Sequence, residues 1–457
     1  MLTVEQKAKL VELSSRCDNF TIVLKWKYPF FTNLENLKKP EKVALIGFFG
    51  EQIESQLSED VKANFDLIIY FKADYTNFSS VYVDSNTITI PELNEFGDEL
   101  VQIVPRQNID FVETEEFMIN TLCCLRERLG LPGVRASDIE HLRNKAILKN
   151  LAYEKGIPTS KFAIVDFKKE SSAQNIADLI DSSIGIYPAF RKPISGCGSG
   201  GGGKLASRKE VESWANERLA AKDQSTYLVE ECLSGLEFWA CCCLLRNGTV
   251  KPLYVIYMER DYTMPKYFQT GRALPFFADR FEDLEDVFPN LKEFTLDCIS
   301  KLNPPHPHPI CIQGFQKNIG DSNYLLTEVG YRTNGARGSA RSYPACGVSQ
   351  EVALIQSHCD PDYTAEPDPN RPTYHECSLW YPQKKGFLRK FSTVPGAPHV
   401  ESSIEVTWRV PLNAELKDAD CFADFIVSLV IRNENKAKMH EDAKWLADNW
   451  APKISPN

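Results

Sequence analysis

A stretch that is mostly glycine lies near the middle of the chain, at residues 195–204. Its other members before Lys204 are small, so the stretch forms a loop whose N–H groups can wrap around phosphate oxygens while the lysine adds charge. It is not a Walker A motif, because no lysine-serine or lysine-threonine pair follows it at a helix start. Two interpretations stay open for the loop alone, a cover over nucleotide phosphates and a flexible linker.

The segments that flank this loop favour the phosphate cover. A predicted strand before the loop ends at Lys192, whose ammonium group can reach a nucleotide phosphate. A second predicted strand ends at Glu230 and Glu231, and Leu233, a turn and Glu237 follow it. This order suits adenine bound by backbone groups at 230–233, with Glu237 accepting hydrogen bonds from ribose hydroxyls. The alternative for Glu237 is a solvated charge at the start of a strand.

Length and composition describe a multidomain globular protein. The 457 residues exceed one typical core and allow two or three packed subdomains. No stretch approaches the ~18 consecutive apolar residues of a membrane span, and the first residues lack a signal-peptide pattern. The formal charge of −10 and the isoelectric point near 5.4 argue against broad binding to nucleic acid.

The cysteines indicate a reducing compartment. The 14 cysteines are spread over a long chain, and Cys241, Cys242 and Cys243 lie together in an apolar, strand-like segment. This distribution differs from the dense disulfide frameworks of small secreted proteins, and the paired spacings of a zinc site are missing. We therefore expect reduced thiols and a cytoplasmic protein.

The first third of the chain alternates apolar strand candidates, such as 43–49 and 66–71, with polar stretches that are compatible with helices. This rhythm is typical of a parallel α/β unit and predicts a Rossmann-like N-terminal domain. The last helix of that domain is predicted at 113–129, with Gly130 ending it.

A second domain is predicted to begin with a helix that Ser137 caps, with Glu140 in the capping-box position. This helix runs to about Lys155 and ends at the Gly-Ile-Pro sequence at 156–158. A strand-rich block with a hairpin turn at 246–248 follows, then a helix at 291–302 and a final amphipathic helix near 437–450. The predicted strands of this part are 162–166, 189–192, 227–231, 238–245, 252–257, 310–315 and 324–329.

Several short motifs in a fixed order resemble the ATP-grasp superfamily over most of the chain. In chain order they are Asn144-Lys145, Gly-Ile-Pro at 156–158, Lys192-Pro193, the glycine-rich loop, Val-Glu-Glu with a later Gly-x-Glu at 229–237, and Glu328 with Arg332. The resemblance implies an α/β and α+β architecture, a Rossmann-like N-terminal domain followed by an ATP-grasp fold in which two α+β subdomains clamp ATP. It implies a pre-ATP-grasp domain (1–135), a small lid subdomain with a central linker (136–232) and a large subdomain with a C-terminal extension (233–457).

Two further segments are similar to ligases of this superfamily. Leu-Gly-Leu-Pro-Gly at 129–133 looks like the pre-ATP-grasp domain of carboxylate-amine ligases, and 268–275 is similar to a segment of the carnosine-synthase-like branch. The activity implied is ATP-dependent formation of an amide or dipeptide-like bond through an acyl phosphate, with release of ADP and phosphate.

The resemblance also implies roles for individual residues. Lys145 and Lys192 should contact the nucleotide phosphates, and Glu328 should hold Mg²⁺, or Mn²⁺, between the β- and γ-phosphates. Such phosphoryl transfer needs oxygen ligands for the metal and cations that neutralise charge. Arg332 should steady the transferring phosphoryl group, and Arg337 should receive a substrate carboxylate, unless it is only a surface charge. The lid residues expected against the phosphates are Ser195, Gly198, Ser199 and Gly200.

The sequence departs from the family pattern at the metal site. The family usually places an acidic residue on the strand before Glu328 and an asparagine two positions after it, where this chain has Gln313 and Gly330. Gln313 can offer a carbonyl oxygen without charge, and glycine offers no side chain. The chain could use Asp321 or substrate oxygens, bind one metal ion rather than two, or have lost catalysis.

The expected substrates are a small carboxylate and a small amine, amino acids in the first place. Neither nucleic acid nor membrane is an expected partner, and a homodimer is one assembly to test. Two other interpretations stay open, a nucleotide-binding protein without ligase activity and an ATP-grasp kinase that phosphorylates a hydroxyl. His306 and His308 alternate with prolines and have no second ligand pair nearby, so we do not interpret them as metal ligands.

Overall fold

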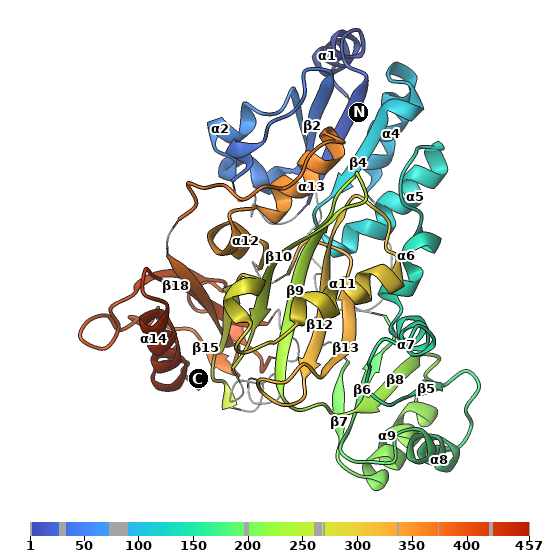
Figure 1. The fold of residues 1–457 in the computed structure, drawn as a ribbon, viewed down its shortest axis with the longest axis vertical. Helices are drawn as coiled ribbons and strands as arrows, with labels where there is room; N and C mark the ends of the chain where they lie inside the picture. The colour runs from blue at the N-terminus through green and yellow to red at the C-terminus, as the bar shows by residue number, and fades with distance from the viewer. Residues whose placement is uncertain are drawn as a thin grey trace.

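The computed structural model describes residues 2–26, 33–72, 90–195, 201–259, 267, 270–335, 338–372, 374–419 and 424–456. Its strands form a parallel four-stranded sheet, an antiparallel four-stranded sheet, a long eight-stranded sheet and a two-stranded ribbon. Figure 1 shows the parallel sheet at the top, the long sheet in the centre and the small antiparallel sheet at the lower right. Within the described ranges, none of the helices has the length and apolar character of a membrane span.

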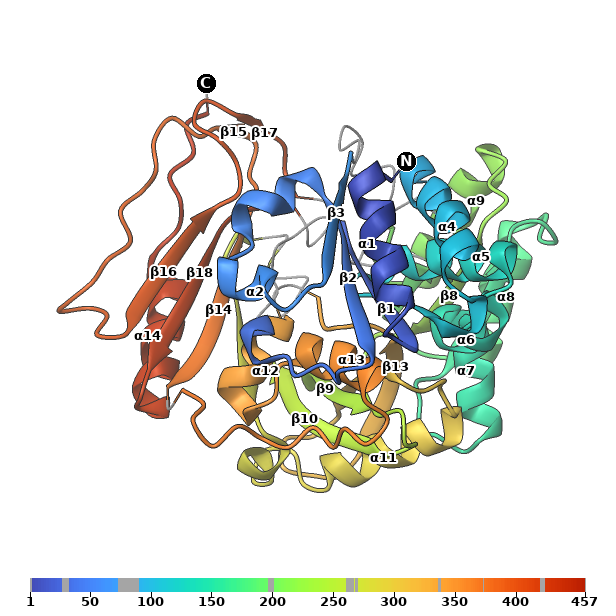
Figure 2. The ribbon, with the colours of Figure 1, turned by 90° about the horizontal axis from the view of Figure 1, so that it is seen from above.

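The N-terminal part is a parallel sheet in the order β3-β2-β1-β4, which confirms the predicted parallel α/β unit. Its apolar cores lie on both faces: α1, α4 and α5 cover one, while α2 and the much later helix α13 cover the other. Figure 2 shows α13 beside this sheet. Its elements are α1 (Val4–Ser14), β1 (Asn19–Lys25), η1 (Leu34–Asn36), β2 (Val43–Gly50), η2 (Glu51–Gln56), α2 (Glu59–Lys62), β3 (Leu67–Phe71), α4 (Pro91–Ile103), η3 (Arg106–Asn108), β4 (Ile109–Glu113), η4 (Glu116–Met118) and α5 (Ile119–Leu129).

Two details of this part differ from the sequence prediction. The central strand β1 is not among the predicted strands, because its buried polar residues Thr21 and Lys25 interrupt the apolar pattern. The helix predicted at 113–129 begins only at Ile119, since Glu113 ends β4 and tertiary contacts hold the segment between them. The predicted end is confirmed, because Gly130 takes the left-handed conformation with φ 65°.

The helix predicted from Ser137 to Lys155 is two helices, α6 (Ala136–Arg143) and α7 (Lys145–Glu154). Asn144 breaks the helical pattern and caps α7, because its side chain accepts hydrogen bonds from the N–H groups of Ala146 and Ile147. The predicted cap at Ser137 is wrong, since the residue at the N-cap is Arg135, whose backbone N–H donates to the side chain of Asp138. The break places Lys145 at the first turn of its own helix.

The small antiparallel sheet has the order β5-β8-β6-β7 and packs on α8 and α9. Phe167, Trp214 and Tyr227 pack edge to face in its core. Gly203 and Lys204, predicted in the glycine-rich loop, belong instead to β7, which pairs with β6, so the loop joins two neighbouring antiparallel strands. The elements are β5 (Phe162–Asp166), α8 (Ala173–Ser183), β6 (Ala189–Pro193), β7 (Gly203–Leu205), α9 (Arg208–Ala220) and β8 (Thr226–Glu231).

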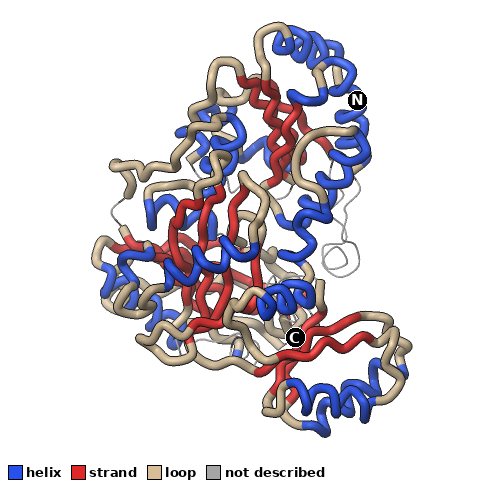
Figure 3. Tube along the Cα trace, turned by 45° about the vertical axis from the view of Figure 1, so that its right-hand side comes forward, coloured by secondary structure: helices blue, strands red, loops and turns tan. Residues whose placement is uncertain are grey.

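The long sheet is antiparallel throughout, in the order β13-β12-β9-β10-β11-β14-β18-β16. It contains the predicted strands of this part, the predicted hairpin with Gly248 at φ 86°, and the buried cysteine run in β9. Figure 3 shows its strands between the other two sheets. Its strands are β9 (Leu236–Leu244), β10 (Val250–Tyr257), β11 (Leu274–Asp279), β12 (His308–Gln316), β13 (Tyr324–Gly330), β14 (His375–Pro382), β16 (Ser403–Trp408) and β18 (Phe425–Asn433).

Helices cover both faces of the long sheet. One face packs against α11 and α14, and the other contacts α12. The predicted helices at 291–302 and 437–450 are confirmed, the second within one residue at each end. The remaining elements are η5 (Phe281–Leu284), α11 (Leu291–Leu302), α12 (Gly338–Cys346), α13 (Gln350–Cys359), α14 (Lys436–Asn449) and the ribbon of β15 (Gly386–Phe387) with β17 (Glu415–Leu416).

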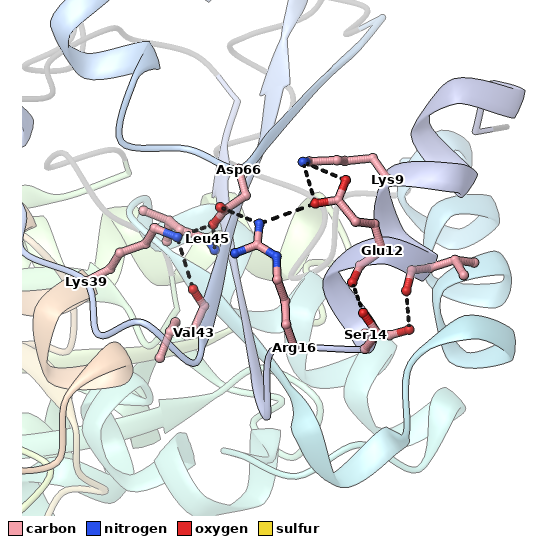
Figure 4. Close-up of polar contacts among 10 residues, drawn as sticks. Lys9, Glu12, Ser14, Arg16, Lys39, Val43, Leu45 and Asp66 are labelled. Atoms are coloured by element: carbon pink, nitrogen blue, oxygen red, sulfur yellow. Dashed lines mark hydrogen bonds and ion pairs between the residues drawn. The ribbon is translucent and has the colours of Figure 1, made fainter.

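A charge network ties α1 to the amino ends of the parallel strands (Figure 4). Asp66, just before β3, accepts hydrogen bonds from Lys39 Nζ at 2.5 Å and from the N–H of Leu45 at 2.9 Å. Arg16 reaches Asp66 at 3.9 Å and Glu12 of α1 at 3.6 Å. We name this set of side chains the amino-end network. It lies at the edge opposite to the carboxyl ends of the strands, where open α/β sheets bind ligands.

Candidate nucleotide and metal site

A lysine joins the small sheet to the long sheet. Lys192 lies next to the last residue of β6, and its Nζ lies 3.0 Å from Oε1 of Glu328 on β13, an edge strand of the long sheet. The same Nζ lies 2.7 Å from Oε1 of Glu230 on β8. Three predicted site residues that are distant in sequence therefore meet where the two sheets approach each other.

The local pairing explains this meeting. Lys192 lies opposite Leu228 in the β6–β8 register, so Glu230, two residues on, shares its face of the small sheet. The N–H of Leu326 on β13 donates to the carbonyl of Pro158 at 2.8 Å, next to a parallel bridge between Thr159 and Leu326. This link fixes β13 against the small sheet two residues before Glu328.

Lys149 completes the charge cluster and is not among the predicted site residues. Its side chain is fully buried, and Nζ lies 3.0 Å from Oε2 of Glu230. It also donates to the hydroxyls of Thr159 at 2.5 Å and Ser160 at 2.8 Å and to the carbonyl of Leu326 at 3.0 Å. Its position four residues after Lys145 on a helix is a signal that could have placed both lysines on one face. We name Lys149, Lys192, Glu230 and Glu328 the clamp cluster.

Opposite charges shift the pKa values of three clamp residues toward the charged form, whereas burial lowers the pKa of the fourth, Lys149. Burial alone would raise the pKa of Glu230, but Lys149 and Lys192 bring it down to about 2. Burial alone would lower the pKa of Lys192, yet Glu230 and Glu328 raise it. Burial would likewise raise the pKa of Glu328, which the charges of Lys145 and Lys192 lower. The opposed charges therefore stabilise each other out of water.

Glu237 and Gln313 lie beside Glu328 on the same face of the long sheet. Gln313 is opposite Glu328 in the β12–β13 register, and Glu237 is opposite Phe315, two residues along β12. Gln313 Nε2 donates to Oε1 of Glu237 at 2.8 Å. Burial raises the pKa of Glu237 to about 7; the Gln313 hydrogen bond opposes this rise, and the nearby charge of Glu328 adds to it.

These residues fit a hard divalent cation. The carboxylate of Glu328 and the amide carbonyl of Gln313, opposite each other on neighbouring strands, are oxygen donors of the kind that Mg²⁺ takes, with nucleotide phosphates and water as its other ligands. No cluster of three His, Cys, Asp or Glu side chains with metal-binding geometry occurs among the described residues. Asp321 lies instead in the hairpin between β12 and β13, where Asn318 and Asn323 donate to it.

Lys145 lies close to the start of the glycine-rich loop. It is the first residue of α7, and its side chain is nearly buried. Its N–H donates to the carbonyl of Ile194 at 2.9 Å, next to the glycine-rich loop. Among the charges near Glu328, that of Lys145 does most to lower the carboxyl pKa. Lys145, Lys192 and Glu328 therefore share one electrostatic site.

Arg332 is bound to the N-terminal part. Its Nε donates to Oε2 of Glu116 in η4 at 2.6 Å, and Nη1 donates to the carbonyl of Thr333 at 3.1 Å. Arg341 is buried in α12 and donates to the carbonyl of Phe276. Arg337 lies outside the described residues.

The structure describes only part of the predicted lid and adenine site. Ser195 is exposed just after β6, while Gly198, Ser199 and Gly200 lie outside the described residues, as do Phe268 and Gln269 of the segment that resembles the carnosine-synthase-like branch. Glu231 ends β8 and Leu233 lies in the connection to β9, both half-buried.

The two histidines of the proline-rich segment have structural contacts. His306 Nδ1 lies 2.8 Å from the carbonyl of Leu245. His308 is buried, stacks on Tyr331 with ring centroids 4.0 Å apart, and lies 3.4 Å from Glu113 of β4. His308 thus joins the long sheet to the parallel sheet.

Solved structures resemble this arrangement, although no family model and no curated protein matches the sequence. An L-amino acid ligase from Bacillus licheniformis superposes with a TM-score of 0.65 at 15% identity, covering 94% of this chain and 98% of that one. An N5-carboxyaminoimidazole synthase from Aspergillus clavatus in complex with ADP and 5-aminoimidazole ribonucleotide gives 0.59 at 11% identity, covering 94% and 99%. The biotin carboxylase domain of the Hydrogenobacter thermophilus 2-oxoglutarate carboxylase with MgADP gives 0.53 at 13%, covering 91% and 86%.

These likenesses establish the fold. A parallel N-terminal sheet followed by antiparallel sheets, matched over nearly the whole chain, is the architecture predicted from the ordered motifs. Lys192, Glu230 and Glu328 meet where the two antiparallel sheets of that architecture approach each other. The chain therefore has an ATP-grasp fold, preceded by a Rossmann-like domain.

Proposed function

We propose that this chain is an ATP-dependent carboxylate-amine ligase of the ATP-grasp superfamily, similar to its carnosine-synthase-like branch. The observation that carries the proposal is the contact of Lys192 with Glu230 and Glu328 across two sheets. A charged Lys192 can bind nucleotide phosphates, and the carboxylate of Glu328 beside it can bind the divalent cation that accompanies them. The likeness to an L-amino acid ligase supports the same direction.

The residues of the chain position and neutralise the reactants. Lys145 and Lys192 bind the phosphates, the lid residues Ser195, Gly198, Ser199 and Gly200 cover them, and the segment at 230–233 with Glu237 binds adenosine. The carboxylate substrate attacks the γ-phosphorus, ADP leaves, and Arg332 neutralises the acyl phosphate. The amine then attacks the acyl carbon, loses a proton and expels phosphate, which leaves an amide. Arg337 receives a substrate carboxylate.

Glu328 would hold Mg²⁺ together with Gln313. When bound, the ion would neutralise part of the phosphate charge. We also propose the division of the chain into 1–135, 136–232 and 233–457, with amino acids as the substrate class.

The test measures ADP release with Mg²⁺ and ATP over a panel of amino acids, alone and in pairs, with hydroxylamine present in parallel samples. The proposal expects ADP release that needs a carboxylate, and a hydroxamate where hydroxylamine replaces the amine. ATP binding without turnover over the panel would favour a nucleotide-binding protein, for which the neutral Gln313 is the supporting observation. Turnover with a phosphorylated hydroxyl and no hydroxamate would favour a kinase.

A further inference from the structure

Glu116 comes from the N-terminal part of the fold and contacts Arg332, close to the proposed metal ligand Glu328. We name the surface formed by Glu328 and Arg332 the catalytic face. Glu116 begins η4, directly after the parallel strand β4, whereas Arg332 follows β13 of the long sheet, four residues beyond Glu328. The distance from Arg332 Nε to Glu116 Oε2 is 2.6 Å, a charge-assisted hydrogen bond between partly exposed side chains. The N-terminal part therefore contributes a charge beside the metal-binding strand.

The backbone around Glu116 is anchored on both sides. Glu115 Oε2 accepts a hydrogen bond from the N–H of Trp26 at 3.0 Å. Thr333 Oγ1 donates to the carbonyl of Thr114 at 2.7 Å. Since Thr333 directly follows Arg332, this second bond ties the arginine's own backbone to the same loop. The loop and the arginine are thus fixed relative to each other at two points.

The place of Glu116 in the parallel sheet is also informative. In the order β3-β2-β1-β4, β2 and β3 follow on one side of β1, whereas β4 lies on its other side. Ligands of open α/β sheets bind at the carboxyl ends of strands where the strand order reverses in this way. Glu116 follows the carboxyl end of β4 at this point. An acid substrate placed there would lie between the parallel sheet and Arg332.

The charges around Glu116 favour an anion. Burial alone would raise its pKa, but Arg332, Arg143 and Lys145 lower it, so Glu116 is an ionised carboxylate among three cations. Because Lys145 is also close to Glu328, two carboxylates share these three cations, and an anionic acyl phosphate beside Arg332 would meet favourable charge. Glu116 therefore acts as a fixed counter-charge rather than as a proton donor.

We propose that Glu116 is a positioning residue that aims Arg332 at the acyl phosphate, so that the Rossmann-like part helps to build the catalytic face. This inference rests on the proposed function. The side chain does not touch the reacting atoms, and it acts by holding the guanidinium in one orientation. Loss of the carboxylate should therefore affect the γ-phosphoryl end and spare the adenosine end of the site.

The experiment compares Glu116→Gln and Glu116→Asp with Glu127→Gln, an exposed glutamate of α5 with the same substitution. Calorimetry measures the Kd of ADP and of a non-hydrolysable ATP analogue with Mg²⁺, and ADP release gives kcat and KM. We expect Glu116→Gln to lower kcat by about 10-fold to 100-fold, the range for a charged hydrogen bond, with an unchanged Kd for ADP. Glu116→Asp should recover part of this loss, and Glu127→Gln should behave as the unmodified chain.

A double variant tests whether Glu116 acts through Arg332. If it does, Glu116→Gln should add less than about twofold to the loss caused by Arg332→Met. Multiplied losses would overturn the inference, and so would a kcat for Glu116→Gln within twofold of the unmodified chain. A parallel loss of ADP affinity and melting temperature would also overturn it, because it would indicate a merely structural role.

The nucleotide measurement separates this inference from the proposed function. An unmodified chain that binds neither nucleotide would contradict both. A chain that turns over with a carboxylate, but whose preference for the ATP analogue over ADP does not change in Glu116→Gln, would contradict only the role of Glu116. A weakened preference in that variant, with ADP binding intact, supports it.

Discussion

The clamp cluster and the amino-end network each place a carboxylate between two cations, yet their surroundings differ. Glu230 lies 3.0 Å from Lys149 and 2.7 Å from Lys192, whose side chains are 0% and 12% exposed. Asp66 lies 2.5 Å from Lys39 and 3.9 Å from Arg16, which are 25% and 50% exposed (Figure 4). Water screens the charges of the amino-end network but not those of the clamp cluster. Loss of one charged partner should therefore lower the free energy of unfolding strongly only in the clamp cluster.

The difference in exposure indicates which of the two charged groups has a role beyond stability. Buried ion pairs are poor devices for stability, because the cost of removing charges from water offsets much of their attraction. Under the proposed function, the buried Lys149 and Glu230 and the largely buried Lys192 keep charges ready for a ligand at a junction between sheets. The amino-end network fastens a helix to the sheet at the edge away from the ligand side.

The largest expected effect is that of Lys149→Met on stability. The substitution leaves Glu230 with one cation fewer in a buried position, so the free energy of unfolding should fall by about 3–5 kcal/mol. Lys39→Met is the matched change in the amino-end network. Urea denaturation of both variants checks the difference, and equal losses would contradict the comparison.

Lys192→Met should have the largest effect on activity. Removing the cation that faces both Glu230 and Glu328 should lower kcat for ADP release by about 100-fold or more, as for the loss of one transition-state donor. Lys39→Met should leave kcat unchanged. A variant without Lys192 that keeps kcat within a few-fold would show that this lysine does not meet the phosphates.

Acid should weaken the contact between the parallel and long sheets. Burial would raise the pKa of Glu113, but Arg126 and His308 bring it down to about 2. A lowered pKa in the folded state means that Glu113 stabilises the fold above its ordinary pKa near 4.5 and that this contribution disappears as the pH falls toward 2. The free energy of unfolding should fall by about 2 kcal/mol more between pH 5 and pH 3 than in Glu113→Gln.

Melting curves of the unmodified chain and of Glu113→Gln over this pH range check the prediction. Parallel curves for the two proteins would show that Glu113 titrates in the same way in the folded and unfolded states. Glu441→Gln, at an exposed position of α14, serves as the control.

The variant Gln313→Glu tests whether position 313 contributes a ligand to the proposed metal site. The substitution restores a second full carboxylate opposite Glu328, so Mg²⁺ should reach half-maximal effect at about tenfold lower concentration. Calorimetry with Mg²⁺ and a non-hydrolysable ATP analogue measures this affinity. Unchanged or weaker binding would show that position 313 does not face the ion.

The smallest expected effect is that of Lys39→Met itself. A partly exposed ion pair contributes about 1 kcal/mol or less, so this variant should unfold only slightly below the unmodified chain. Added salt should narrow that gap further, whereas the deficit of Lys149→Met should change little. Urea denaturation at low and high salt measures both differences.

Sequence reasoning reached the fold and the residues whose spacing is local. Motifs at strand ends and helix starts predict the site residues that the structure brings to one junction. They are Lys145, Lys192, Glu230, Glu237, Gln313 and Glu328. Their roles with nucleotide and metal stay predictions. The break at Asn144 was missed, because the capping side chain competes with a helical pattern that continues on either side.

What the sequence did not indicate depends on contacts between distant segments. Glu116 pairs with Arg332 across more than two hundred residues, and α13 covers a sheet formed far earlier in the chain. In the sequence, Lys149 has the pattern of an ordinary helical lysine. Only the folded structure shows it buried in contact with Thr159, Ser160 and Glu230. Charge and periodicity cannot indicate burial of this kind, because it arises only from tertiary packing.

The most direct test of the central claim follows oxygen from substrate to phosphate. The acid that supports ADP release is supplied with ¹⁸O in its carboxylate, and the released phosphate is examined by mass spectrometry. Activation through an acyl phosphate predicts one ¹⁸O atom in each phosphate formed, because the attacking carboxylate oxygen leaves with phosphorus when the amine displaces it. Phosphate without the label, released together with ADP, would contradict a carboxylate-activating enzyme built around Lys192 and Glu328.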